Sequence, residues 1–317
     1  MKVIDILQKS DRPIFSFELV PPLRGGDIHR IYEAIEPLIK FAPPFINITF
    51  HRDEEEYRER PDGSIVKVTV TKRPGSVALA AAIMKRYPVE VVPHIVCGGA
   101  TRHSIENDLI DLHFLDIENV MVLRGDPVSG QRHFIPEEGG HKYSYELVEQ
   151  IVRMNQGKYL DDTLTDAVPT NFCIGVAGYP EKHYEAPNPT CDIENLKRKV
   201  DAGADYIVTQ MFFDNDKYFS FVEKCRTIGI TIPIIPGLKP ISTFKHLETL
   251  PRTFSLDIPE GLEHAIRKCH TNKEVNRVGI EWCIAQSREL IRKGAPAVHY
   301  YTIGKSENIQ EIVKQVF

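Results

Sequence analysis

The stretch Ile14-Phe15-Ser16-Phe17-Glu18-Leu19 is a short apolar run that ends before Pro21-Pro22, as expected of a buried strand and the turn after it. Seven further apolar runs lie along the chain, at residues 45–49, 91–96, 119–123, 172–177, 206–209, 234–237 and 297–301. The intervals are long enough for crossover helices between parallel strands. The pattern predicts an α/β fold, a (β/α)8 TIM barrel. A flat doubly wound sheet is the alternative, but the sequence offers no strand–GxGxxG–helix fingerprint in its favour.

Size and composition agree with one large soluble domain over residues 1–317. The chain has 317 residues, of which 42% are hydrophobic and 26% charged, and barrels of this kind routinely exceed the usual domain length. The net charge of −5 argues against a nucleic-acid-binding protein. No run approaches the roughly 20 apolar residues that span a bilayer. The six cysteines are scattered without a CxxC pair, which predicts reduced thiols in a cytoplasmic protein.

Two segments depart from the repeating strand and helix pattern. Residues 51–76 open with a charge run at 52–56, turn at Pro61-Asp62-Gly63, and continue with Val66, Val68 and Val70 alternating with polar residues. We interpret this segment as an excursion from the barrel rim with a half-exposed strand. Residues 127–141 form a second polar loop. Because both segments follow strands, both are expected on the catalytic face. At the beginning of the sequence, residues 1–12 predict an amphipathic helix that turns Val3, Ile4, Ile6 and Leu7 toward the core.

In a barrel the carboxyl ends of the strands converge on one mouth. The polar residues at those ends are Glu18, Thr49, His94, Asp126 and Gln210. A carboxyl held against apolar walls, as predicted for Glu18, has a raised pKa that suits a general acid. The alternative for Glu18 is a solvent-facing carboxylate or one paired with Arg24.

Two local patterns could bind a ligand. In Leu123-Arg124-Gly125-Asp126-Pro127, the glycine lets backbone approach a ligand and Asp126 supplies a charge, although an ordinary Asp-Pro turn has the same pattern. Residues 192–200 predict a helix with Asp192 as N-cap and a buried stripe of Ile193, Leu196 and Val200. Its adjacent face would suit a ribose and a phosphate, or be merely solvated; that face carries Asp192, Asn195 and Lys199, flanked by Arg198.

Two other chemistries find little support. His94 and Cys97 lie in an apolar strand and lack a second pair of ligands, so no metal site is predicted. The chain also lacks the GxSxG elbow of serine hydrolases.

Taken in order, several short motifs resemble the methylenetetrahydrofolate reductase family. They are Phe15-Ser16-Phe17-Glu18 with Pro21-Pro22, and the stretches at 93–97, 123–126, 177–181, 195–204, 209–214 and 235–240. Each is weak alone, but their ordered combination runs nearly the full length of the chain. The resemblance implies a FAD-binding (β/α)8 barrel that reduces 5,10-methylenetetrahydrofolate to 5-methyltetrahydrofolate, the methyl donor for methionine synthesis.

The resemblance also implies roles for individual residues. Glu18 matches the general acid that protonates folate N10 as the imidazolidine ring opens, and the resulting iminium takes hydride from flavin N5. Asp126 matches an aspartate near the flavin and the pterin, Gln210 a folate contact, and Phe244 a phenylalanine against the substrate. Thr49 and His94 match residues lining the flavin ring, with Thr49 also facing the substrate. The remaining implied FAD contacts are Leu123, Arg124, Gly125, Tyr143, Ala177, Tyr179, His183, Asp192, Asn195, Arg198 and Lys199.

The resemblance implies a ping-pong reaction, in which NADH or NADPH reduces the flavin and leaves before folate binds, and a homo-oligomeric enzyme. The sequence does not distinguish the two nicotinamides. Where relatives have a short segment after Thr49, this chain has the charged excursion. Two other hypotheses are a flavin-free barrel that transfers a methyl group from folate, and a non-catalytic folate- or flavin-binding protein. The combination of Glu18, Asp126 and Gln210 argues against the second, because passive binding needs no acid.

Overall fold

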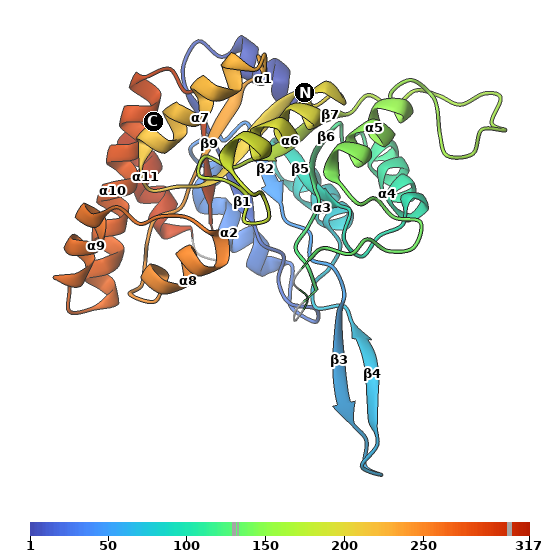
Figure 1. Cartoon of the computed structure of the whole chain (residues 1–317), viewed down its shortest axis with the longest axis horizontal. Helices are drawn as coiled ribbons and strands as arrows, with labels where there is room; N and C mark the ends of the chain where they lie inside the picture. The colour runs from blue at the N-terminus through green and yellow to red at the C-terminus, as the bar shows by residue number, and fades with distance from the viewer. Residues whose placement is uncertain (129–130, 132, 303–305) are drawn as a thin grey trace.

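The chain closes eight parallel strands into a barrel, seen in a computed structural model that describes residues 1–128, 131, 133–302 and 306–317 (Figure 1). The strand order around the barrel is β1-β10-β9-β8-β7-β6-β5-β2. The barrel strands are β1 (Ile14–Leu19), β2 (Phe45–Ile48), β5 (Glu90–Val96), β6 (Asn119–Leu123), β7 (Cys173–Gly178), β8 (Tyr206–Met211), β9 (Ile234–Leu238) and β10 (Ala297–Tyr301). All eight predicted strands are therefore confirmed, and with them the single-domain (β/α)8 TIM barrel.

Helices surround the strands on the outside. They are α2 (His29–Ile39), α3 (Ser76–Arg86), α4 (Arg102–Phe114), α5 (Ser144–Met154), α6 (Pro189–Asp201), α7 (Asn215–Thr227), α8 (His246–Phe254), α9 (Glu260–Arg267), α10 (Asn272–Arg292) and α11 (Glu307–Val316). In β1, Phe15, Phe17 and Leu19 join the apolar core between strands and helices. The alternate residues Ser16 and Glu18 face the barrel interior, because successive side chains of a strand point to opposite faces.

Helix α1 (Val3–Lys9) closes the amino-terminal end of the barrel. Val3 is fully buried and packs with interior residues at the amino-terminal end of the barrel, such as Phe45 and Met121. Ile4 and Leu7 are partly buried against the same cluster. The Val3 amide donates to Asn119 Oδ1 at 2.8 Å. The predicted amphipathic helix is confirmed, and the carboxyl ends of the strands form the open end.

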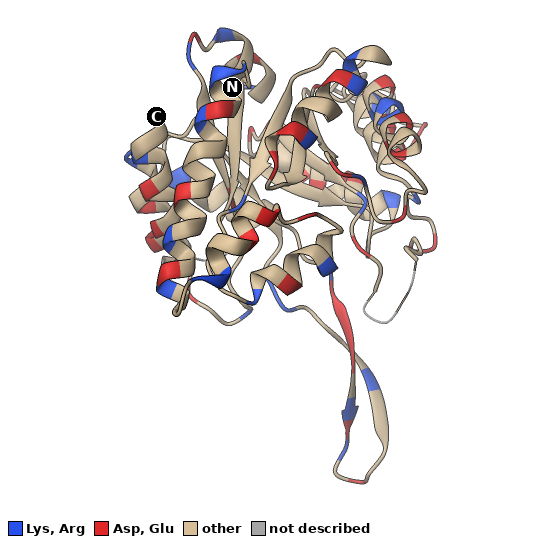
Figure 2. Ribbon diagram, turned by 60° about the vertical axis from the view of Figure 1, so that its left-hand side comes forward, with Lys and Arg blue, Asp and Glu red and all other residues tan. Residues whose placement is uncertain are grey.

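The rim excursion is a two-stranded antiparallel hairpin that projects from the open end (Figure 1). It consists of β3 (Glu54–Glu59) and β4 (Ile65–Val70), with Val66, Val68 and Val70 half-buried as the alternation predicted. The acidic run, interpreted as a solvated face, is the other strand of this hairpin. It stays largely exposed, and Lys67 and Lys72 form ion pairs with its glutamates. Figure 2 shows both acidic and basic positions along the ribbon of the hairpin.

Two further properties bear on the class of protein. Among the described residues, no helix combines the length and the apolar character needed to cross a membrane. The six cysteines are free thiols, and Cys97, Cys173, Cys225 and Cys283 are buried.

Candidate active site

Glu18 and His94 meet at the open end of the barrel. His94 Nε2 lies 3.5 Å from Glu18 Oε2, and both side chains are largely buried. The Asn47 amide nitrogen lies 3.4 Å from the same His94 nitrogen, although Asn47 Oδ1 has no partner among the described residues. Glu18 therefore pairs with His94 from β5 and not with Arg24. The structure brings together two of the five predicted strand-end residues in direct contact.

Strand register explains why these side chains meet. Glu18 is aligned with Asn47 on β2 and with Tyr301 on β10. Aligned residues of parallel strands point to the same face, so all three side chains turn into the barrel mouth. The Tyr301 hydroxyl donates to the Thr209 carbonyl at 2.7 Å. Its ring lies over Gly237, where an added Cβ would come within 2.7 Å of it, so glycine at this position makes room for the tyrosine.

Burial sets the charge state of this group. Burial raises the pKa of Glu18 from 4.5 to about 8, with the charge of Lys239 opposing the rise. Burial lowers the pKa of His94 to about 3, and the neighbouring His51 adds to that effect. Near neutral pH, Glu18 is thus mainly protonated beside an uncharged histidine. A proton held on a carboxyl of this pKa can be transferred to a basic atom of a substrate.

Lys239 and Tyr301 were missed by the sequence reasoning. Lys239 directly follows β9 and is only 7% exposed, and Tyr301 is the last residue of β10. Both are polar residues at strand ends, the same signal that singled out Glu18 and Gln210. Tyr300-Tyr301 by themselves are equally consistent with core or rim packing.

A second group of charged and aromatic residues lies at the ends of β6 and β7. Arg124 Nη1 forms an ion pair with the Glu185 carboxylate. The rings of Tyr179 and His183 meet edge to face, with centroids 4.9 Å apart. Lys199 donates from helix α6 to the Ala177 carbonyl, and its Nζ lies 6.0 Å from the centre of the Tyr179 ring. Burial lowers the pKa of Lys199 to about 8, while Asp192 opposes that shift.

Helix α6 begins three residues earlier than predicted. Its N-cap is Asn188, whose side chain accepts from the Cys191 amide, so the prediction of Asp192 as N-cap is wrong. The physical reason is that Pro189 occupies the first helical turn, where its lack of an amide hydrogen costs nothing. Asp192 lies within that turn and accepts from the His183 amide at 3.0 Å, fixing the loop between β7 and α6.

The predicted face of α6 is only partly assembled. Ile193 and Leu196 are buried as predicted, whereas Val200 is half-buried against the core. Lys199 is turned toward the barrel mouth, because it donates to the carbonyl of Ala177 in β7. Asp192 is turned toward the loop between β7 and α6 and accepts from the His183 amide. Asn195 and Arg198 are exposed on the same helix.

Several features fit a bound dinucleotide with a diphosphate. Arg124 Nη2 is buried and has no partner among the described residues, so it has hydrogen-bonding capacity to spare. Gly125 adopts φ +88°, and a Cβ added there would come within 2.6 Å of the Val96 side chain. This position therefore has room for backbone but not for a side chain, and a ligand can approach the backbone closely. The guanidinium of Arg124 and the ammonium of Lys199 are the cations expected around phosphate oxygens. The residues present therefore fit FAD.

The other predicted residues are placed around these two groups. Asp126 is exposed next to Leu123-Arg124-Gly125, and Thr49 is half-buried with its hydroxyl 3.2 Å from His51 Nε2. The side chain of Gln210 accepts from the Met211 amide at 2.9 Å, at an irregularity of the β8–β9 pairing. Phe244, 36% exposed, precedes α8, and Tyr143 is exposed at the start of α5. These residues lie on the same side of the barrel, and within the described part of the chain none of them forms a hydrogen bond or ion pair with Glu18.

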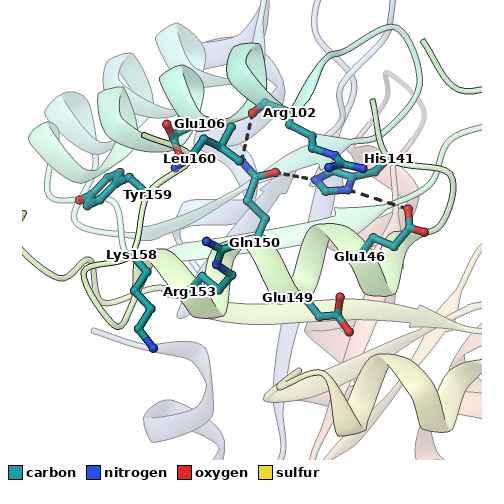
Figure 3. A pocket seen from close by; sticks show the side chains of 10 residues that line it. All are labelled: Arg102, Glu106, His141, Glu146, Glu149, Gln150, Arg153, Lys158, Tyr159 and Leu160. Carbon is teal, nitrogen blue, oxygen red and sulfur yellow. Dashed lines mark hydrogen bonds and ion pairs between the residues drawn. The ribbon is translucent and has the colours of Figure 1, made fainter. Parts of the chain in front are cut away.

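Two cavities are lined by residues other than Glu18 and His94. One, of about 220 Å³, lies between α4 and α5 and is lined by charged residues such as Arg102, Glu106 and Arg153 (Figure 3). Within it, His141 Nε2 contacts Gln150 Oε1 at 2.5 Å, and Gln150 in turn donates to the Arg102 carbonyl. The other, of about 700 Å³, lies beside α8 and α9 and includes Phe244. Within the described parts of the chain, no cluster of three or more His, Cys, Asp or Glu side chains is arranged to hold a metal ion.

Comparison with known proteins places this site in a family. The family model for methylenetetrahydrofolate reductase matches residues 2–317, and the chain belongs to that family. A relative from Arabidopsis thaliana, methylenetetrahydrofolate reductase (NADH) 1, is 32% identical over 96% of this chain and 48% of its own. The chain thus spans about half the length of that relative. The 5,10-methylenetetrahydrofolate reductase of Pectobacterium carotovorum is 29% identical over 92% of this chain and 86% of its own.

Solved structures share the fold at low sequence identity. An uncharacterized protein from Clostridium thermocellum that binds two copies of 5-methyl-5,6,7,8-tetrahydrofolic acid superposes with a TM-score of 0.58 and 14% identity, covering 98% of this chain and 96% of its own. A tryptophan synthase chain from M. tuberculosis gives a TM-score of 0.51 and 11% identity, over 99% of this chain and 96% of its own. These likenesses agree with the barrel.

Proposed function

We propose that the protein reduces 5,10-methylenetetrahydrofolate to 5-methyltetrahydrofolate with a nicotinamide reductant and bound FAD. The observation that carries this proposal is the largely buried Glu18 carboxyl at the barrel mouth, 3.5 Å from His94, where burial raises the pKa of Glu18 to about 8 and lowers that of His94 to about 3. Membership of the methylenetetrahydrofolate reductase family supports the reaction class. Relatives are named both for NADH and for NADPH, so the proposal leaves the nicotinamide open.

Bound FAD would supply the redox chemistry, taking hydride from the nicotinamide and giving it to the folate. Arg124, with its buried unpartnered nitrogen, and Lys199 would hold the diphosphate. Asp192 would hold the loop beside the diphosphate in place, because it accepts from the His183 amide. Gly125 would let the backbone approach the cofactor, because it has no side chain. Thr49 and His94 would line the ring system, and Asn195, Arg198, Tyr143 and Tyr179 would bind the adenosine end.

Glu18 would give its proton to folate N10. The O–H bond of Glu18 breaks as an N–H bond forms, which allows the methylene bridge to open to an iminium at N5. The carboxylate left behind and the exposed charge of Asp126 both favour that cation electrostatically. Gln210 and Phe244, at the ends of β8 and β9, would orient the pterin and the aromatic part of the substrate. Glu18 recovers its proton from solvent before the next turnover.

The proposal is tested by loading the purified protein with FAD and supplying NADH or NADPH together with 5,10-methylenetetrahydrofolate. Catalytic formation of 5-methyltetrahydrofolate is expected. A protein that binds methyltetrahydrofolate but no flavin would instead be a folate methyltransferase. A protein that binds FAD or folate without turnover would be a binding protein. A homo-oligomer in the cytoplasm is also proposed, and light scattering of the purified chain checks the oligomeric state.

A further inference from the structure

Lys239 lies in line with the acid of the proposed reaction. Leu238 is aligned with Tyr300 in the last residue pair that joins β9 and β10, and Lys239 and Tyr301 are the residues that directly follow this pair. Tyr301 is in turn aligned with Glu18 on β1. Aligned residues of parallel strands share a face, and Tyr301 and Glu18 therefore point together into the mouth of the barrel, where Lys239 lies at the end of β9.

A buried ammonium needs a partner that compensates for its lost hydration. Lys239 is only 7% exposed. Glu18 limits the fall in the pKa of Lys239, and Lys239 in turn limits the rise in the pKa of Glu18. From helix α8, His246 also faces Lys239, and it accepts from the Ser242 amide at 3.2 Å through Nδ1. Burial lowers the pKa of His246, so near neutral pH this ring is uncharged and adds no second positive charge beside Lys239.

The other titratable groups around Glu18 are also uncharged near neutral pH. His94 from β5 has a lowered pKa, and so do His51 before the hairpin and His299 from β10. Burial raises the pKa of Tyr301 far above its usual range. Glu18 and Lys239 are thus the two members of this group whose charges can change together in the neutral to alkaline range.

We propose that Lys239 is a positioning residue for the reaction: it lies at the end of β9, separated by one strand from Glu18 at the barrel mouth, and places an ammonium beside that carboxyl. This inference rests on the proposed role of Glu18 as acid. Lys239 acts through Glu18 and not on the folate. After Glu18 has given its proton to the substrate, its carboxylate lies near the ammonium of Lys239. The attraction between the two charges stabilises the deprotonated form of Glu18, and with it the state in which the substrate is protonated.

Burial and the lysine act on Glu18 in opposite directions. Burial raises its pKa to about 8, and the Lys239 charge limits that rise. Conversely, burial lowers the pKa of Lys239 to about 8 while Glu18 limits the fall. Removing the lysine charge should therefore raise the pKa of Glu18 further. A general acid works in its protonated form, so the loss of activity at alkaline pH would then occur at higher pH.

The test is the pH profile of folate reduction by the pre-reduced, FAD-loaded protein. Lys239→Met should move the alkaline limb up by about one pH unit, the smaller end of the effect of a nearby opposite charge. Lys239→Arg, which keeps a permanent charge, should leave the limb in place or move it down. Lys268→Met, the same change at the exposed lysine that forms the C-cap of α9, should leave the profile unchanged.

A second readout titrates Glu18 without turnover. The infrared carboxyl band that disappears in Glu18→Gln should titrate at higher pH in Lys239→Met than in the parent. Coincident titrations and coincident pH limbs in the parent and Lys239→Met would overturn the inference. If Lys239→Met does not fold, an upward shift of the limb in Lys239→Arg would overturn it. Parental folate reduction by Glu18→Gln would instead refute the acid itself, a separate failure of the proposed function.

Discussion

Glu18 Oε2 and His94 Nε2 lie 3.5 Å apart at the barrel mouth, yet the two groups do not form a charged pair near neutral pH. Burial raises the pKa of Glu18 to about 8 and lowers the pKa of His94 to about 3, so the proton resides on the carboxyl. The unprotonated His94 nitrogen can accept a hydrogen bond from that carboxyl. The pair therefore keeps the Glu18 acid in its protonated form near neutral pH.

Replacing the acid should separate binding from chemistry. Glu18→Gln keeps the size of the side chain but cannot donate a carboxyl proton, so the rate of folate reduction by the reduced protein should fall by about 100-fold or more. FAD should remain bound, because Arg124 at the end of β6 and Lys199 on α6 are unchanged. Stopped-flow measurement of flavin reoxidation gives the rate. The control is Glu223→Gln on the exposed side of α7, which should match the parent.

The raised pKa of Glu18 also makes the fold sensitive to pH. The unfolded carboxyl ionises near its ordinary value of 4.5, whereas the folded one keeps its proton up to about 8. Between these values the folded state binds more protons, so Glu18 lowers the free energy of unfolding progressively as pH rises. Glu18→Gln has no such titration. Urea unfolding should therefore show the variant gaining stability over the parent between pH 5 and pH 8, and an equal difference at both would contradict the assigned burial.

The buried lysine of α6 is expected to contribute to FAD affinity. Lys199→Gln removes a charge that would meet the diphosphate, a loss of roughly 1.5–3 kcal/mol for a hydrogen bond to a charged group. The Kd for FAD should rise by about 10- to 100-fold. Fluorescence titration of the flavin-free protein measures it. Lys197→Gln, on the same helix but paired with Asp201 at the surface, is the matched control; equal affinities for the two variants would remove Lys199 from the FAD site.

The projecting hairpin should contribute little to the stability of the barrel. Its ion pairs, such as Lys72 with Glu54, are exposed and each worth about 1 kcal/mol or less. Replacing residues 53–71 by a short Gly-Ser linker keeps Arg73, which donates to the Pro21 carbonyl at the rim. The Tm should change by less than about 3 °C. Calorimetry gives the Tm, and a large drop would mean that the hairpin belongs to the folding core.

The sequence predicts the barrel well because periodicity is a local signal. Each strand appears as an apolar run with its own turn, and β1, β6 and β10 begin and end at the predicted residues. The hairpin was half predicted: alternation of Val66, Val68 and Val70 revealed β4, but the glutamates of β3 carry no such pattern. Charged residues form a strand there because the partner strand supplies the hydrogen bonds.

The site was less predictable because it depends on register between distant strands. Glu18 and His94 were named from their positions, but nothing local indicates that they lie 3.5 Å apart. Lys239 went unnoticed since its partner Glu18 is more than 200 residues away and is brought near it by closure of the barrel. Asp192 was predicted as the N-cap because it directly precedes the apolar stripe of the helix, whereas Asn188 followed by Pro189 was the stronger signal.

The most direct test of the account follows a single turnover at the flavin. The FAD-loaded protein is photoreduced without oxygen and mixed with 5,10-methylenetetrahydrofolate while flavin absorbance is recorded. The account predicts rapid return of the oxidised spectrum, with one 5-methyltetrahydrofolate formed per flavin reoxidised. A flavin that stays reduced in the presence of the folate would contradict it.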